Sequence, residues 1–457
     1  MPKAHMRKVL AVSAASALAV GLAGCSGGSS GGDGSGPKKI VVASVNNGPM
    51  MTMQEMAPEF TKETGIEVEF VMLTENDIRS KIQQDVAVNG GQFDVVTLGT
   101  NDASTYVESG WTEPIEPLLD AMSDEEKEAY DADDLIAGTL AGFTSEKAGL
   151  GAIPLYGEST MLMYRTDLFE AAGLTMPEEP TWEEVYDFAT QLNDPATGTV
   201  GMALRGKAGY GENMYVFNTI MNAFGAQIAN EDWTGAYDTP EMAEAWEFYR
   251  KLQQDAGARE VTSNGYTETL NLMSSGKAAI YYDATVSADV FEGEDSAVKG
   301  KMGYAMSPAG PGKGNTQTVG GWGLALTTSS KQKDAAFDFM TWVTSKDYVQ
   351  LVAEKKGWLN VLTGARASTY EAPEYQAVAP YASLVLNSLE KVDWTHPAVG
   401  ETPYVGNSLP AIPEWAGMGE QIGQTLAEYV SGSGDTDAAL AKAQDIANAA
   451  FKDGGRQ

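Results

Sequence analysis

The sequence predicts an α/β protein in which open, mostly parallel sheets are covered by helices. Short apolar runs alternate with segments whose apolar residues recur at helical spacing, and the alternation comes in two successive series. The part that follows a Gly/Ser-rich stretch has about 420 residues, which is more than one hydrophobic core usually organises. Two domains are therefore expected.

The first series lies between residues 39 and 110. Strands are expected at 39–45, 66–73 and 93–99, because each is a short, mostly apolar run. The helix after the first strand is indicated by apolar residues at helical spacing, Met53, Met56, Ala57 and Phe60. Glycines end this helix and the one after the third strand, at Gly65 and Gly110. A β-α-β-α-β order implies a parallel sheet.

The second series predicts further strands and helices. Strands are expected at 152–156, 160–165, 277–283, 301–308 and 320–327. Two helix starts carry capping signals: a capping box at Thr181, and a cap at Thr239 followed by Pro240. The last third is mostly helical, with amphipathic segments at 334–345 and 418–432.

Polar residues follow most of the expected strands. They are Asn46, Asn47, Thr74, Glu75, Thr100, Asn101, Glu158, Arg205 and Asp283. Ligands of open α/β sheets bind beyond the carboxyl ends of the strands, so these residues predict a polar cleft. The alternative is that they are turn residues and helix caps, because Asn and Asp favour both positions.

The N-terminus is typical of an exported protein. Three basic residues precede an uncharged apolar run, Val9 to Leu22, of about 14 residues, which is the length of a secretory signal rather than of a membrane span. The run ends in Leu22-Ala23-Gly24-Cys25, which resembles the bacterial lipobox. Residues 1–24 are thus expected to be a signal peptide, and Cys25 the lipidated first residue of the mature chain. The alternative is an ordinary signal followed by an incidental free thiol.

Residues 25–37 are expected to be a flexible tether, because Ser26 to Gly36 are Gly and Ser with one Asp. The whole chain has a formal net charge of −33. Such acidity argues against nucleic acid and against an anionic membrane surface as partners.

Several classes of catalytic and metal site lack the residues they need. The two histidines are His5, in the signal, and His396, so a Ser-His-Asp triad would depend on His396 alone. A zinc site usually needs several His or Cys, and no phosphate-binding loop occurs; we expect neither a metal nor a cofactor. A secreted glycosidase stays open, because it needs only two carboxylates.

The chain resembles the extracellular solute-binding proteins of ABC importers, in the carbohydrate group related to maltose-binding protein. The resemblance rests on four segments: residues 92–115, 153–184, 275–285 and 319–345. Three shorter stretches, GESTMLMYR, LRGKAGYGENM and YYDAT, look most like the branch that binds sugar alcohols such as sorbitol and mannitol.

The resemblance implies a two-lobe periplasmic-binding-protein fold of type II, with hinge crossovers and a ligand clamped between the lobes. Lobe 1 is expected at 38–147 and 285–345, and lobe 2 at 148–284 and 346–457. Asn101 stands where relatives have a sugar-binding aspartate, and Glu158 where they have a sugar-binding glutamate. Asp283 and Trp322 fall where relatives line the cleft, although Trp322 could instead be a core residue beside the hinge.

The expected ligand-binding residues are therefore Asn46, Asn47, Glu75, Thr100, Asn101, Glu158, Arg205, Asp283 and Trp322. In this interpretation Glu158 and Asp283 accept hydroxyls, Arg205 donates to two of them, and Trp322 provides an aromatic face.

The function that follows is that of a non-enzymatic, monomeric receptor. It would be anchored through Cys25 to the outer face of the bacterial cytoplasmic membrane and would deliver a sugar alcohol to a permease pair with a cytoplasmic ATPase. The alternatives are a mono- or oligosaccharide receptor of the same family and, in another class, a secreted glycosidase.

Overall fold

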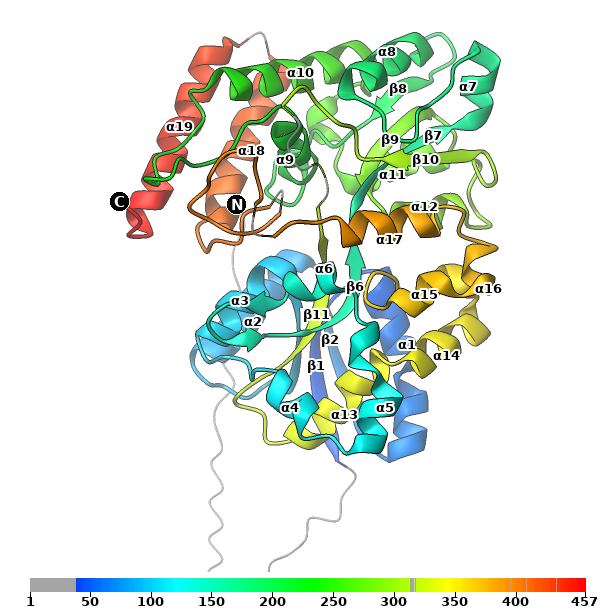
Figure 1. Cartoon of the computed structure of the whole chain (residues 1–457), viewed down its shortest axis with the longest axis vertical. Helices are drawn as coiled ribbons and strands as arrows, with labels where there is room; N and C mark the ends of the chain where they lie inside the picture. Colours follow the sequence, from blue (N-terminus) through cyan, green and yellow to red (C-terminus); the bar gives the residue numbers. More distant parts are fainter. Residues whose placement is uncertain (1–37, 313–315, 317, 395, 408, 433) are drawn as a thin grey trace, which may run out of the picture. The chain divides into compact units, whose positions relative to one another are not determined.

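The computed structural model describes residues 38–312, 316, 318–394, 396–407, 409–432 and 434–457. Residues Lys38–Gln457 form one compact unit. The predicted signal peptide, Cys25 and the predicted tether lie outside the described residues. Two mixed sheets organise this unit, each covered by helices, and we call each sheet with its helices a lobe (Figure 1).

The first sheet has the strand order β2-β1-β3-β11-β6. Its strands are β1 (Lys39–Val45), β2 (Glu67–Leu73), β3 (Val95–Gly99), β6 (Ile153–Glu158) and β11 (Gly320–Leu326). β1 pairs in parallel with β2 and β3, whereas β11 runs antiparallel to both β3 and β6. All seven residues of β11 are buried, as expected for a strand that is covered on both faces.

The second sheet has the order β10-β7-β9-β8. Its strands are β7 (Thr160–Arg165), β8 (Val200–Ala203), β9 (Ala278–Ala284) and β10 (Met302–Met306). Only the pair β8–β9 is parallel among these strands. The two-lobe α/β fold is thus confirmed, but the expectation of mostly parallel sheets is wrong. The antiparallel pairs arise where strands cross between the lobes, and apolar runs alone do not reveal strand direction.

The helices surround the two sheets (Figure 1). Those with the first sheet are α1 (Gly48–Thr64), α2 (Glu75–Ala87), α3 (Thr100–Glu108), α4 (Glu116–Asp120), α5 (Asp124–Tyr130), α6 (Ala137–Ala141), α13 (Lys333–Val343), α14 (Lys346–Lys356), α15 (Ala367–Glu371) and α16 (Pro373–Gln376). Those with the second sheet are α7 (Thr166–Ala172), α8 (Trp182–Leu192), α9 (Asn213–Ala223), α10 (Pro240–Ala256), α11 (Tyr266–Ser274), α12 (Ser287–Phe291), α18 (Trp415–Ser431) and α19 (Thr436–Asp453). A short ribbon, β4 (Thr144–Ser145) with β5 (Gly149–Leu150), and three 3₁₀ turns, Ala132–Asp134, Val261–Ser263 and Trp358–Asn360, complete the elements.

The capping signals read from the sequence are present in the structure. The Thr181 hydroxyl accepts from the backbone N–H of Glu184, whose carboxylate returns to the Thr181 backbone N–H, so α8 begins with a capping box. The Thr239 hydroxyl accepts from the Met242 backbone N–H at the start of α10, and Pro240 occupies the first turn. Among the described residues, every helix is too short or too polar to cross a bilayer.

The chain crosses between the lobes at Ser159. β6 ends at Glu158 in the first sheet and β7 begins at Thr160 in the second. The Ser159 backbone N–H donates to the Thr285 hydroxyl at 3.1 Å, and the Thr285 backbone N–H donates to the Ser159 carbonyl at 2.8 Å. The two segments that leave β6 and β9 are therefore tied together at the crossing, directly beside Glu158.

A further connection is made by α17 (Ala382–Glu390), which contacts both α6 and β10. The Tyr381 ring, just before α17, packs edge-on against Tyr304 of β10, with 5.0 Å between ring centroids. Beyond α17, the Trp394 indole N–H donates to the carbonyl of Gly138 in α6 at 2.8 Å. This helix therefore bridges the two lobes.

The lobe boundaries expected from the sequence differ from the membership of the sheets in three places. β6, expected in lobe 2 (148–284), belongs to the first sheet, and β10, expected in lobe 1 (285–345), pairs with β7 of the second. The segment from α14 to α16, within the lobe 2 range 346–457, packs with the first lobe, where Lys355 and Lys356 pair with Glu59 and Glu55 of α1. A sheet change at a single residue, such as Ser159, leaves no mark in composition.

Candidate functional site

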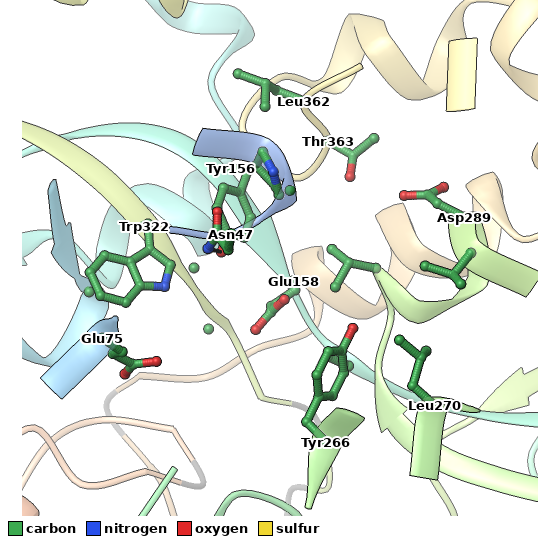
Figure 2. Close-up of a pocket in the computed structure, with 18 of the residues that line it drawn as sticks. Asn47, Glu75, Tyr156, Glu158, Tyr266, Leu270, Asp289, Trp322, Leu362 and Thr363 are labelled. Carbon is green, nitrogen blue, oxygen red and sulfur yellow. Dashed lines mark hydrogen bonds between the residues drawn. The ribbon is translucent and has the colours of Figure 1, made fainter. Parts of the chain in front are cut away.

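A cavity of about 830 Å³ lies between residues of the two lobes. The ends of β1, β2 and β3 contribute one wall, and residues of α9, α11 and α12 contribute the other. The side chains that the following paragraphs discuss are Asn47, Glu75, Arg79, Tyr156, Glu158, Arg205, Tyr215, Tyr266, Asp289 and Trp322. Many of them are shown in Figure 2, with Glu158 at the centre of the view. Among the described residues, no group of three or more His, Cys, Asp or Glu is arranged to hold a metal ion.

Asn47 connects a helix start to the cavity. It is the N-cap of α1, and its side-chain oxygen accepts from the Met50 backbone N–H at 3.1 Å. Its side-chain N–H donates to the Tyr156 hydroxyl at 3.0 Å. The Tyr156 hydroxyl can therefore present its own hydrogen to the cavity, while burial raises the pKa of Tyr156 and keeps it neutral.

Replacing Asn47 with alanine is expected to lower the free energy of unfolding by about 1 kcal/mol, because the N-cap of α1 is lost. The neighbouring Asn46 is exposed, and Asn46→Ala is a matched control that should leave stability unchanged. Urea denaturation of the two variants without ligand measures the difference. Equal stability of the two variants would contradict the capping role of Asn47.

Arg205 is held by a buried ion pair. Its Nε donates to one carboxylate oxygen of Asp283 at 2.7 Å and its Nη2 to the other at 2.5 Å, while Nη1 donates to the Gly211 carbonyl at 2.7 Å. Burial opposes the charge, but the attraction and hydrogen bonds of Asp283 outweigh it and raise the pKa of Arg205. Of the five guanidinium N–H groups three are used, so two can still donate to a ligand.

Two tyrosines enclose the Arg205 guanidinium. Its central carbon lies 4.7 Å from the ring centroid of Tyr215 and 4.8 Å from that of Tyr266, so both rings make cation–π contacts. The Tyr215 hydroxyl is buried, and none of the described residues is its hydrogen-bond partner. Burial raises the pKa of Tyr266 to about 12. Both hydroxyls therefore stay protonated and can donate hydrogen bonds.

Glu158 is the last residue of β6 and faces the cavity. Its carboxylate has no ion-pair or hydrogen-bond partner among the described residues, although the Arg205–Asp283 pair lies nearby. Burial raises the pKa of Glu158 to about 7; Arg205 works in the opposite direction, and Asp283 and Glu75 add to the rise. At neutral pH this carboxyl is therefore poised between its two states and is free to accept hydrogen bonds.

Trp322 is a large aromatic residue of the cavity wall that the first lobe contributes. Its ring carries Arg79 at 4.9 Å from the guanidinium carbon to the ring centroid, so one face of the indole is covered. Arg79 in turn pairs with Glu75 at 3.1 Å, one helical turn away on α2, and with Asp102. Trp322 itself stands on β11, opposite Gly99 and Tyr156 in the flanking strands.

Two glycines next to Trp322 let the backbone of β11 approach β6 closely. A side chain on Gly321, where φ is +140°, would lie 2.3 Å from the Tyr156 carbonyl oxygen, and one on Gly320 would lie 3.3 Å from a Glu158 carboxylate oxygen. At Gly321, β11 can thus pair with β6 beneath the cavity only because this position lacks a Cβ, whereas at Gly320 the Glu158 side chain would have to shift.

The structure brings six of the nine expected site residues to the cavity: Asn47, Glu75, Thr100, Glu158, Arg205 and Trp322. Asn46 is not among the residues that line it and is exposed. Asn101 lies within α3, but its side chain is outside the described part of the structure.

Asp283 is a correction to the expected site. It is fully buried and is absent from the cavity wall, and both of its oxygens are occupied by Arg205. It cannot accept two ligand hydroxyls as expected; it orients the guanidinium that faces the cavity. The position near the end of β9 correctly placed Asp283 close to the cavity. Its side chain, however, lies behind Arg205 and not in the cavity wall.

Sequence reasoning missed several residues of the cavity wall. Arg79, Tyr215, Tyr266 and Asp289 come from the interior of helices or their first turns and follow no strand. The i,i+4 spacing of Glu75 and Arg79 was a signal that could have placed Arg79 beside the strand end. Tyr215 and Tyr266 are far apart in sequence and meet only around Arg205.

The site is therefore a water-accessible cavity with many hydrogen-bond donors and acceptors, and its described lining includes five aromatic rings, those of Tyr156, Tyr210, Tyr215, Tyr266 and Trp322. Carboxylates, guanidinium and hydroxyl groups alternate with apolar surface. This composition suits a small ligand with several hydroxyl groups.

Comparison with known proteins places these observations in a family. The family model described as "Bacterial extracellular solute-binding protein" matches residues 45–350. The chain is 40% identical over 411 residues to the mannitol-binding protein of Pseudomonas aeruginosa, covering 90% of this chain and 92% of that protein.

Two solved structures agree with the fold. An ABC transporter solute-binding protein of Agrobacterium vitis with bound D-mannitol is 40% identical, with a TM-score of 0.85, covering 92% of this chain and 99% of the other. A solute-binding protein of Agrobacterium radiobacter in complex with ribitol is 24% identical, with a TM-score of 0.78, covering 90% and 98%, and supports the fold alone. The two-lobe fold, the cavity between the lobes and these matches lead to one conclusion: the chain belongs to the bacterial extracellular solute-binding protein family.

Proposed function

We propose that the protein is the substrate-binding component of an ABC importer and that its ligand is an acyclic sugar alcohol of the sorbitol, mannitol, xylitol or arabitol type. The observation that carries the proposal is the cavity at the crossing between the lobes, where Glu158, Arg205 and Tyr156 present groups that bind hydroxyls. The similarity to the mannitol-binding protein and to the solved structure with D-mannitol supports the ligand class.

Each hydroxyl of a polyol both donates and accepts a hydrogen bond. The Glu158 carboxylate would accept from two neighbouring hydroxyls, and the two remaining N–H groups of Arg205 would donate to oxygens beside them. The uncovered face of Trp322 would lie against the C–H side of the chain. Selectivity would follow because a deoxy analogue leaves a buried partner unpaired, at about 1–3 kcal/mol for each group.

No bond of the ligand is made or broken in this function. Contacts from both lobes would be complete only when the lobes close, so binding would stabilise the closed form. The loaded protein, as a monomer, would then dock on a permease pair driven by a cytoplasmic ATPase. Membership of a family of solute-binding proteins supports this reading over that of an enzyme.

Titration calorimetry tests the ligand class. D-Mannitol, D-sorbitol, xylitol and D-arabitol are titrated into the purified protein beside glucose and maltose, and at least one polyol is expected to bind more tightly than either sugar. Binding of maltose or glucose alone would overturn the proposal in favour of a sugar receptor. Hydrolysis of an aryl glycoside by the same preparation would favour the glycosidase.

We also propose that Cys25 carries the lipid that holds the protein to the outer face of the cytoplasmic membrane. The basic residues, the apolar run and the sequence Leu22-Ala23-Gly24-Cys25 support it. A multi-chain anchor would retain the receptor near its permease and raise its effective concentration there. Mass spectrometry of the protein from its native host should find a lipid-modified N-terminal cysteine; an unmodified thiol would contradict the anchor.

A further inference from the structure

The cationic side chains of the cavity are all paired with carboxylates. Lys356 pairs with Glu55, and Arg79 pairs with Glu75 and Asp102. Arg205 is bound by Asp283 in two hydrogen bonds, and Glu212 lies 3.9 Å from its Nη1. Each positive charge that lines the cavity is thus already balanced by at least one negative one.

Among the residues that the structure describes, two carboxyl groups of the cavity wall have no cationic partner. Glu158 has neither an ion pair nor a hydrogen bond to any of the described residues, and Asp289 of α12 accepts a hydrogen bond from the neutral Tyr381 hydroxyl. Figure 2 shows Glu158 and Asp289 facing the same space. When both carboxyls are ionised, the cavity wall therefore carries more negative charge than the cations of the described residues balance.

Glu158 is the better placed of the two for a hydroxyl-rich ligand. Its neighbours on the cavity wall are Arg205, Tyr156 and Tyr215, which are hydrogen-bonding groups. The Asp289 carboxyl, by contrast, already accepts a hydrogen bond from the Tyr381 hydroxyl. A cation bound at Glu158 could therefore belong to a molecule whose remaining carbons carry hydroxyls.

We propose that the cavity also accepts amino alditols, that is, sugar alcohols in which one hydroxyl is replaced by an ammonium group, and that the ammonium pairs with Glu158. This inference rests on the proposed polyol function and extends its ligand class. An ammonium group only donates and a carboxylate only accepts, so the exchange of hydroxyl for ammonium costs no hydrogen bond at Glu158 and adds an ion pair.

Protonation of Glu158 should then govern this part of the affinity. The charged and titratable groups that face it are Glu75 of α2, Tyr156 of β6, Arg205 after β8, Tyr215 of α9, Tyr266 of α11, Asp283 of β9 and, across the cavity, Asp289 of α12, whose pKa burial also raises to about 7. Burial, Asp283 and Glu75 raise the pKa of Glu158 to about 7 against the pull of Arg205, so the carboxylate is mostly ionised at pH 8 and mostly protonated at pH 6. The affinity for an amino alditol should therefore rise between pH 6 and pH 8.

The experiment compares matched ligand pairs by calorimetry at pH 8: D-sorbitol with 1-amino-1-deoxy-D-sorbitol, and D-mannitol with 1-amino-1-deoxy-D-mannitol. The purified protein should bind at least one amino alditol as tightly as its parent polyol. Glu158→Gln should weaken the amino alditol at least about ten-fold more than the parent, because a charged hydrogen bond is lost. The matched variant Asp289→Asn should keep the wild-type preference between the two ligands.

The outcomes separate the inference from the function on which it rests. Polyol binding with amino alditols at least ten-fold weaker, or Glu158→Gln weakening both ligands equally, would overturn the inference and leave the polyol function standing. Loss of the preference in Asp289→Asn alone would overturn the assignment to Glu158. Binding of neither ligand class would overturn the polyol function itself.

A measurement on the unaltered protein tests the inference even if the Glu158→Gln variant does not fold. Calorimetry at pH 7 in buffers of different ionisation enthalpy counts the protons exchanged on binding. An ammonium beside Glu158 lowers the pKa of the carboxyl, so the amino alditol should release more protons than its parent. Equal proton release by the two ligands would contradict the pairing.

Discussion

Asp283→Asn is expected to lower the free energy of unfolding of the unliganded protein by about 3–5 kcal/mol, because it leaves the Arg205 guanidinium buried without its counter-charge. Asp283 is fully buried and Arg205 is 7% exposed, so water cannot replace the lost partner. The carboxylate also fixes the guanidinium between the rings of Tyr215 and Tyr266. The affinity for the ligand should fall together with the free energy of unfolding, although Asp283 is not expected to contact the ligand.

Urea denaturation and calorimetry together measure this effect. Glu294→Gln is the control, because Glu294 forms an exposed ion pair with Lys299 in the same lobe and should change neither property. A variant Asp283→Asn that unfolds like the unaltered protein would show that Arg205 does not depend on the pair. Unchanged affinity in a stably folded variant would show that Arg205 does not bind the ligand.

Glu158→Gln should have the opposite effects on stability and binding at pH 8. Its folded-state pKa of about 7 lies above the value of about 4.3 for glutamate in an unfolded chain. Between these values the folded protein keeps a proton that the unfolded chain has released, so stability falls as pH rises through this window. The penalty is fully present at pH 8 and absent near pH 4.

Glutamine removes that penalty, and the variant should be more stable than the unaltered protein at pH 8 by about 1–3 kcal/mol, with the lower end favoured because Glu158 faces the cavity. The same variant should bind the polyol at least about ten-fold more weakly, because a carboxylate that accepts two hydroxyls is lost. Thermal unfolding at pH 4.5 and pH 8 checks the first effect. A variant that is less stable at both pH values would assign Glu158 a structural role instead.

The sequence predicted the first wall of the cavity for a physical reason. β1, β2 and β3 are parallel, so their carboxyl ends meet at one edge of the sheet, and the residues that follow them, Asn47, Glu75 and Thr100, lie there together. The alternative interpretation is also correct for one of them: Asn47 is a helix cap and a cavity residue at once, because its amide has groups for both tasks.

The residues of the second wall could not be predicted from the sequence in this way. Its residues depend on which helix faces Arg205 and on the direction of strands that cross between the lobes. Asp283 ends an expected strand but points away from the cavity, and Tyr266 follows no strand at all. The change of sheet at Ser159 could not be predicted either, because β6 and β7 are both apolar runs. These features depend on tertiary packing, which neither composition nor periodicity encodes locally.

A crystal structure of the protein with the polyol that binds most tightly tests the central claim most directly. We predict that the polyol lies between the lobes, with two of its hydroxyls within hydrogen-bonding distance of the Glu158 carboxylate and another accepting from Arg205. A polyol bound elsewhere, or in the cavity without contact to either side chain, would contradict the account.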